Sequence, residues 1–144
     1  MIIVGAGGFA KEVFDVIYYR PECQYYQLLF FDDISDKTRQ YDHVVLKNFD
    51  DVKKSLKIDP YFCLGFASPI NRMKLYNKFI ELGGIPYLLI ANTAKYGRGT
   101  VIGKGCNIMY GTIITVDCKI GDGCLINWNC TIGHDSKIGH FTEL

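Results

Sequence analysis

A six-residue repeat runs without a break through the C-terminal third of the chain. Every sixth position from Ile90 is occupied, in order, by Ile90, Tyr96, Ile102, Ile108, Ile114, Ile120, Ile126, Ile132, Ile138 and Leu144. From Tyr96 onward, the position two residues earlier is always small: Ala94, Thr100, Cys106, Thr112, Cys118, Cys124, Cys130, Ser136 and Thr142. Residues two apart face the same side of a strand, so a small and a large side chain both point inward in each repeat. Three repeats close one triangular coil, and the sequence predicts three coils of a left-handed parallel β-helix over residues 90–144.

Glycines and cysteines occupy regular places in this repeat. Glycine often follows the inward aliphatic residue, at Gly97, Gly103, Gly121, Gly133 and Gly139, where we expect turns with positive φ. The chain has six cysteines and no C-x-x-C pair. Four of them occupy the small inward position, where a thiol acts as a compact hydrophobic group. We therefore expect structural cysteines, with Cys23 and Cys63 outside the repeat, and no metal site.

The N-terminal half alternates strands with helices. The expected strands span 1–4, 28–31, 43–46, 61–65 and 85–90, and the expected helices span 9–19, 50–56 and 69–82. Ser68 and Pro69 are typical of a helix start, and Gly83 of a helix end. Such alternation predicts a Rossmann-like, mostly parallel sheet over residues 1–89, followed by the β-helix as a second domain, 90–144.

The first strand is followed by a glycine-rich turn that fits the pattern G-x-G-x-x-G/A. Gly5, Gly7 and Gly8 can bring backbone N–H groups and a helix N-terminus against a phosphate. Asp32 and Asp33 end the second strand, where carboxylates could bind a ribose or a base. These features favour a nucleotide-bearing ligand. A tight strand-to-helix junction and ordinary turn chemistry at the two aspartates are the alternative.

Composition excludes several classes of function. The formal net charge is +1 and the basic residues are spread along the chain, so we expect no nucleic-acid partner. No apolar run approaches the length of a membrane span, and the N-terminus has no secretory signal pattern. These observations predict a cytoplasmic protein with no membrane partner.

Taken in order, the motifs resemble those of the sialic acid O-acetyltransferase family. The resemblance rests on the segment Gly5–Val13, on Phe31-Asp32-Asp33, on Leu64-Gly65 with Arg72, and on repeats that contain Ile126-Asn127 and Ile132-Gly133-His134-Asp135. This family of sugar O- and N-acetyltransferases belongs to the hexapeptide-repeat acyltransferases. It includes enzymes that acetylate nucleotide-linked 4-amino sugars for bacterial surface glycans. The resemblance covers essentially the whole chain.

The resemblance implies a function and a set of site residues. It implies a homotrimer that binds acetyl-CoA as cosubstrate between neighbouring β-helices, without a metal. It assigns His134 as the general base, Asp135 as the residue that orients it, and Asn127 as a supporting residue. The nucleotide sugar would be bound by Gly5, Gly7, Gly8, Phe9, Asp32, Asp33, Gly65 and Arg72. The chemistry of the residues agrees, because a histidine beside a carboxylate suits proton transfer near neutral pH.

Three departures from the family pattern affect these expectations. Phe9 stands where many relatives have a histidine that contacts substrate, which leaves the sugar open. The segment His140-Phe141-Thr142-Glu143-Leu144 lacks a histidine that often lies near the CoA arm. His140 also repeats the local pattern of His134 one hexad later. The chain stops in mid-pattern at Leu144, so we expect a C-terminally truncated β-helix with an incomplete acetyl-CoA site.

Other functions remain open at the level of sequence. The acceptor could be a hydroxyl of free or polymeric sialic acid instead of an amine. A nicotinamide-dependent oxidoreductase would use the glycine turn, but the N-terminal region is short for a full dinucleotide fold and the β-helix would have no role. A non-catalytic trimeric scaffold that binds a nucleotide sugar is the last alternative.

Overall fold

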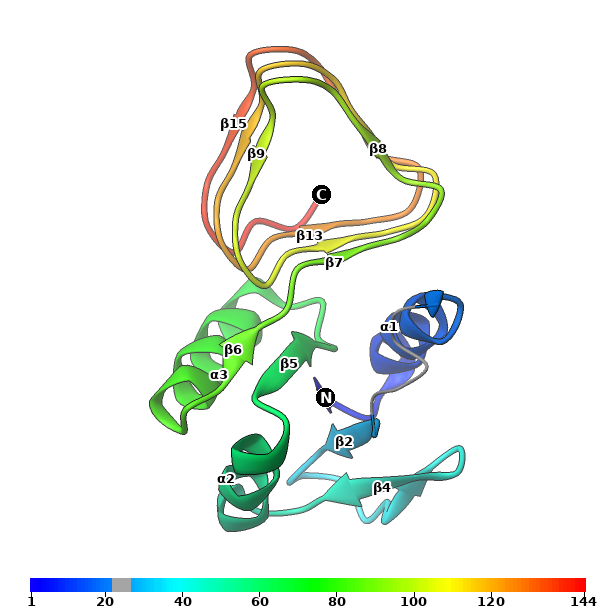
Figure 1. Ribbon diagram of the computed structural model, residues 1–144, viewed down its shortest axis with the longest axis vertical. Helices are drawn as coiled ribbons and strands as arrows, with labels where there is room; N and C mark the ends of the chain where they lie inside the picture. Colours follow the sequence, from blue (N-terminus) through cyan, green and yellow to red (C-terminus); the bar gives the residue numbers. More distant parts are fainter. Residues whose placement is uncertain (22–26) are drawn as a thin grey trace.

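The computed structural model describes residues 1–21 and 27–144, and shows a six-stranded sheet with three helices joined to a triangular β-helix (Figure 1). Cys23 lies outside the described residues. Among those described, no helix is both long enough and apolar enough to cross a membrane.

The N-terminal sheet is parallel except at one edge. Its strands are β1 (Ile2–Val4), β2 (Leu29–Phe31), β3 (Arg39–Gln40), β4 (His43–Leu46), β5 (Tyr61–Leu64) and β6 (Ile85–Pro86), in the order β3-β4-β2-β1-β5-β6. Only the β3–β4 pair is antiparallel. The short strand β3 is the one element of this sheet that the sequence did not predict.

Three helices cover the two faces of this sheet. They are α1 (Gly8–Tyr18), α2 (Phe49–Ile58) and α3 (Pro69–Glu81). Because successive side chains of β1 alternate, Ile3 packs with Val13 of α1 on one face, while Ile2 and Val4 pack with α2 and α3 on the other. Alternation therefore gives two hydrophobic layers from one fully buried strand, as expected of a doubly wound sheet.

The β-helix consists of nine two-residue strands arranged in three parallel sheets. The first sheet contains β7 (Leu89–Ile90), β10 (Asn107–Ile108) and β13 (Leu125–Ile126); the second contains β8 (Lys95–Tyr96), β11 (Ile113–Ile114) and β14 (Thr131–Ile132); the third contains β9 (Val101–Ile102), β12 (Lys119–Ile120) and β15 (Lys137–Ile138). Strands 18 residues apart pair in register, for example Ile108 with Ile126. This register confirms the predicted repeat.

Burial follows the predicted inward positions in the middle of the stack and weakens at its ends. Ile108, Ile114 and Ile126 are at most 1% exposed, and the thiols Cys106, Cys118 and Cys124 are fully buried among them. Tyr96 in the first coil and Leu144 at the other end are 56% and 44% exposed. A side chain in the middle coil is enclosed by one coil above and one below, whereas a side chain in an end coil has a neighbouring coil on one side only.

The glycines that follow the inward residues do not have the positive φ that the sequence predicts. Gly97, Gly103 and Gly121 do not have positive φ; the left-handed residues lie two positions later, at Gly99, Gly105, Gly111, Asp117, Gly123, Asn129, Asp135 and Phe141. A Cβ on Gly121 would lie 2.6 Å from the backbone nitrogen of His140 in the next coil. The physical requirement at Gly121 is therefore close stacking of coils, and the turn takes its left-handed residue elsewhere.

The two domains share a continuous core. The outer face of the first β-helix sheet, through Leu89, Met109 and Leu125, belongs to the same hydrophobic cluster as Val13 of α1. The predicted strand 85–90 is in fact two strands, since β6 pairs with β5 and β7 pairs with β10. The chain therefore leaves the six-stranded sheet and enters the β-helix between these two strands.

Candidate functional site

The glycine turn joins β1 to α1 and presents an open helix N-terminus. Gly5 has φ of 120°, and a Cβ there would lie 3.0 Å from the carbonyl oxygen of Gly65; a Cβ on Gly65 would lie 2.9 Å from the Cβ of Ala10. Gly7 and Gly8 are exposed, with open space where a Cβ would stand. Gly7 caps α1 without a side-chain hydrogen bond. The first N–H groups of α1 thus face an open surface suited to an anion.

Asp32 shapes the loop that follows β2. Its carboxylate accepts hydrogen bonds from the N–H groups of Ile34 and Ser35, at 3.0 and 3.1 Å, and from the Ser35 hydroxyl at 2.7 Å. Partial burial opposes the charge, but these hydrogen bonds and the charge of Lys47 keep the pKa of Asp32 below its usual value. Asp33 is exposed. Of the two predicted carboxylates, Asp33 is therefore the better placed for a ligand.

Lys37 lies beside the glycine turn, and the sequence did not single it out. Its ammonium group donates to the carbonyl oxygen of Ala6, within the glycine turn, at 3.1 Å, and also reaches Gln40 at 3.5 Å. Lys37 follows Asp33 by four residues in the same loop, but no motif marks it. Its position adds a positive charge to the N-terminus of α1, where phosphate oxygens would be stabilised.

Arg72 has a structural environment. The side chain is 0% exposed, and its guanidinium donates to the carbonyl oxygens of Leu64, Phe66, Gly123 and Cys124 and to the side-chain oxygen of Asn107. Burial lowers the pKa of Arg72 to about 10, within the range in which it stays protonated at neutral pH. Arg72 thus joins the end of β5 to the β-helix, and has no exposed atom to offer a substrate.

His134 and Asp135 form an exposed pair on the turn between β14 and β15. Nδ1 of His134 lies 2.8 Å from Oδ2 of Asp135, and both side chains are 77% exposed. Asp135 has φ of 58°, a conformation that aspartate tolerates better than most residues. If Nδ1 carries the proton that this bond requires, Nε2 is the nitrogen that can accept a proton from a substrate.

His140 differs from His134 despite the shared pattern. Nδ1 of His140 accepts a hydrogen bond from the backbone N–H of Asp122 at 2.9 Å, on the vertex of the β-helix that lies against α3. That nitrogen is used within the fold. Oδ2 of Asp122 lies 3.8 Å from the same nitrogen, and Asp122 belongs to the preceding coil of the β-helix.

The predicted residues form two groups that one chain does not bring together. The glycine turn, Asp33 and Lys37 lie at the carboxyl ends of β1 and β2. His134 lies on the vertex between the sheet of β8 and the sheet of β15, which points away from the N-terminal domain (Figure 1). Asn127 lies at the other end of β14 from His134, on the vertex beside α1.

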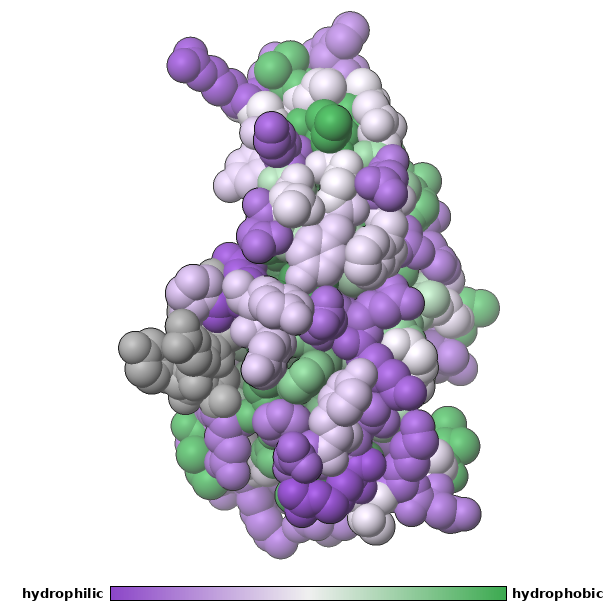
Figure 2. All heavy atoms as spheres, turned by 90° about the vertical axis from the view of Figure 1, so that its right-hand side faces the viewer, coloured by the Kyte–Doolittle hydropathy of each residue, from purple (hydrophilic) through white to green (hydrophobic). Residues whose placement is uncertain are grey.

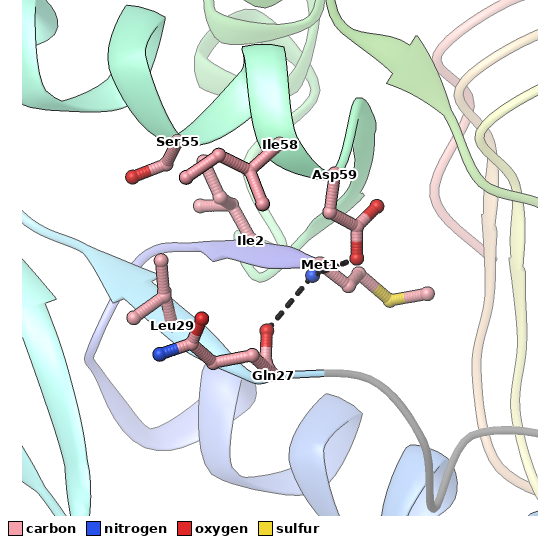
Figure 3. A pocket seen from close by; sticks show the side chains of 7 residues that line it. All are labelled: Met1, Ile2, Gln27, Leu29, Ser55, Ile58 and Asp59. Carbon is pink, nitrogen blue, oxygen red and sulfur yellow. Dashed lines mark hydrogen bonds and ion pairs between the residues drawn. The ribbon is translucent and has the colours of Figure 1, made fainter.

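Neither described cavity coincides with these groups. One, of about 230 Å³, lies at the amino-terminal edge of the sheet between Leu29, Ile58 and Asp59, where the Met1 amino group bonds to Gln27 and Asp59 (Figure 3). Ligands of open parallel sheets bind at the opposite edge. The other, of about 490 Å³, is an open hollow between Tyr76, Ile85 and Lys104. Within the described residues, no cluster of His, Cys, Asp and Glu could hold a metal ion, and five cysteines are free thiols.

The combination of a doubly wound sheet with a β-helix defines a class of two-domain protein, and the N-terminal domain gives the family. Residues 1–79 match the model of the PglD N-terminal domain, which is more than half of the chain. The chain therefore belongs to the PglD N-terminal domain family. No curated protein matches the chain.

Three solved structures share the fold over 99% of this chain. The acetyltransferase domain of PglB from Neisseria gonorrhoeae is 21% identical with a TM-score of 0.85, over 68% of its own length. A variant of perosamine N-acetyltransferase from Caulobacter crescentus, in complex with CoA and GDP-perosamine, is 23% identical with a TM-score of 0.83, over 66% of its length. WeeI from Acinetobacter baumannii is 24% identical with a TM-score of 0.84, over 69% of its length. These likenesses confirm the predicted fold, and the chain spans about two thirds of each relative.

Proposed function

We propose that this protein is an acetyl-CoA-dependent acetyltransferase that acetylates the amine of a nucleotide-activated sugar. The observation that carries the proposal is the exposed His134–Asp135 pair on a β-helix joined to a PglD-type N-terminal domain. In support, similar structures contain CoA with GDP-perosamine, or acetyl-CoA. A role in surface glycan synthesis, and membership of the sialic acid O-acetyltransferase group, are part of the same proposal.

The chemistry requires one base and no metal. The sugar amine attacks the thioester carbonyl of acetyl-CoA, and Nε2 of His134 takes the proton that the nitrogen loses. The tetrahedral intermediate then expels the CoA sulfur, which receives this proton, so an amide and free CoA thiol are formed. Asp135 holds the imidazole through Nδ1 and stabilises its positive charge. Acetyl-CoA supplies the activated acyl group.

The N-terminal domain would hold the nucleotide sugar. The N–H groups at Gly7 and Gly8 and the ammonium group of Lys37 would bind the phosphates, with Gly5 and Gly65 keeping the turn tight and Phe9 beside it. Asp33 would face the ribose or base, while Asp32 keeps the loop in shape. We reassign Arg72 from substrate binding to support of this end of the sheet.

Separation of the two groups of residues favours a trimer. The vertex between β14 and β15, which carries His134, points away from the N-terminal domain of its own chain (Figure 1), so a second copy would present its histidine to a sugar bound at the glycine turn. The first sheet of the β-helix packs on the N-terminal domain, so one of the two remaining sheets would pack against neighbouring copies around a threefold axis, with acetyl-CoA between copies. Asn127, beside α1, would then support the histidine of the neighbouring copy.

The test measures binding and turnover separately. Calorimetry would titrate the chain with UDP- and GDP-linked 4-amino sugars and with NAD; we expect one carrier to bind, NAD not to bind, and Asp33→Ala to weaken binding. Release of CoA thiol would report turnover, and His134→Gln should reduce it by about two to four orders of magnitude while binding stays unchanged.

Other outcomes select the alternatives. Unchanged turnover in His134→Gln would eliminate His134 as the base. Binding of both a nucleotide sugar and acetyl-CoA with no turnover in the wild type would favour the non-catalytic scaffold. Turnover with free or polymeric sialic acid, without nucleotide-sugar binding, would favour hydroxyl acetylation.

A further inference from the structure

Trp128 is held rigidly on the vertex of the β-helix that lies beside α1. Its indole Nε1 donates to a carboxylate oxygen of Glu12 at 2.8 Å, its ring packs on Tyr110 with centroids 5.1 Å apart, and its backbone N–H donates to the side chain of Asn127. These contacts fix the ring, yet the residue is 44% exposed. Its surroundings therefore hold an aromatic surface in place and leave part of it open.

The contact with Glu12 locates this surface relative to the glycine turn. Glu12 lies in α1, four residues after Gly8, where the helix begins. Side chains on a helix lean towards its N-terminus, so the Glu12 carboxylate lies on the N-terminal half of α1. Trp128, bonded to that carboxylate, therefore lies beside the N-terminal half of α1, the half that carries the N–H groups proposed to bind the phosphates. Figure 2 views the side of the molecule on which α1 and β8 lie, and hydrophobic residues are scattered over it, with no single large patch.

We propose that the exposed part of the Trp128 ring packs against the sugar ring of the nucleotide sugar. This inference rests on the proposed function, because it assumes phosphates bound at α1. The sugar follows the second phosphate and must leave the glycine turn across the neighbouring surface. A hexose presents C–H groups on its ring faces, and a fixed aromatic ring buries them at little cost in conformational entropy. Since the indole N–H is already bonded to Glu12, the remaining contact is apolar and recognises a ring face with few hydroxyl groups, as in a deoxy sugar.

The chain contains one tryptophan, so its fluorescence reports on Trp128 directly. The experiment titrates the wild-type chain with the UDP- or GDP-linked 4-amino sugar that binds in calorimetry, and with the matching UDP or GDP. We expect a change of tryptophan emission with the nucleotide sugar and little change with the nucleoside diphosphate. In calorimetry, Trp128→Ala should bind the nucleotide sugar about tenfold more weakly and the nucleoside diphosphate as well as wild type. Trp128→Phe, which keeps a ring, should retain part of the difference.

Tyr18→Ala provides a matched control, because Tyr18 is an aromatic residue on the same helix, 66% exposed and at its far end. It should leave both affinities unchanged. An equal loss of both affinities in Trp128→Ala would overturn the proposal, since the residue would then only hold α1 in place. Unchanged emission and unchanged affinities would also overturn it. Failure of the wild type to bind any of the nucleotide sugars would instead refute the proposed function, and this inference with it.

Discussion

Lys37 brings a positive charge to the glycine turn from a different part of the chain. Its ammonium group bonds to the Ala6 carbonyl oxygen, while the neighbouring Lys47 bonds to the carbonyl oxygen of Ser35 in the same loop. Asp32 fixes the start of this loop, where its carboxylate accepts hydrogen bonds from the N–H groups of Ile34 and Ser35. One carboxylate therefore sets a loop conformation from which a lysine reaches the proposed phosphate site.

Replacement of Lys37 tests this role. Lys37→Met keeps the length of the side chain and removes its charge, so we expect affinity for UDP or GDP to fall by about tenfold to a hundredfold. Calorimetry at two salt concentrations measures the effect, which should shrink at high salt because the site is exposed. Lys53→Met, on the exposed side of α2, is the control and should bind as wild type. Equal affinities for Lys37→Met and wild type would remove Lys37 from the site.

Side-chain reach explains what the sequence did and did not reveal about single residues. His134 and Asp135 could be predicted as a pair because they are adjacent, and the repeat places them on a turn. Lys37 has no periodic position, so its contact with Ala6 depends on a loop path that no pattern encodes. Arg72 was expected at a substrate, but its burial depends on how the two domains pack, which lies beyond local sequence.

At the level of elements, the repeat determines strand register far more strongly than it determines turn conformation. A slip of one residue would turn every inward Ile outward, so the in-register pairs such as Ile114 with Ile132 follow from the pattern alone. The short β3 carries no such pattern in its two residues, and it forms because the chain folds back beside β4. The prediction of positive φ at Gly97, Gly103 and Gly121 is wrong, because close approach of two backbones selects glycine as strongly as positive φ does.

Two glycines at equivalent positions separate these requirements. A Cβ on Gly121 would meet the backbone of Gly139 and His140 in the next coil at 2.6 to 2.9 Å, whereas Gly133 lies in the last of the three coils, has no coil stacked on it, and a Cβ there would meet nothing within 4 Å. We expect Gly121→Ala to lower the free energy of unfolding by about 1–3 kcal/mol, because the coils must move apart. Gly133→Ala should change it little. Urea unfolding measures both, and equal effects of the two substitutions would refute close stacking as the reason for Gly121.

At the level of the whole molecule, polar contacts bridge the two domains around a shared hydrophobic core. Arg20 donates to the carbonyl oxygen of Ile90, Trp128 donates to Glu12, and Asn107 donates to the carbonyl oxygen of Leu64. Arg72 lies beside Asn107 and donates to both domains. These contacts fix the N-terminal domain on one sheet of the β-helix. They therefore fix the direction, relative to that domain, of the vertex that carries His134.

Arg72 offers the sharpest test of this coupling. Arg72→Met keeps an apolar side chain of similar length but leaves buried acceptors, including the Gly123 and Phe66 carbonyl oxygens, without their donor. We expect a loss of about 3 kcal/mol or more in the free energy of unfolding. Arg72→Lys should recover little of it, because one ammonium group cannot match the planar fork. Arg98→Met removes an exposed arginine and should change stability by less than about 0.5 kcal/mol.

Hydrogen exchange adds the decisive readout: in Arg72→Met, amides of β1 should open at a lower free energy than amides of β10, because the N-terminal domain can then open while the β-helix stays folded. If both strands lose protection equally, Arg72 stabilises the molecule as one unit and does not control the coupling of its domains.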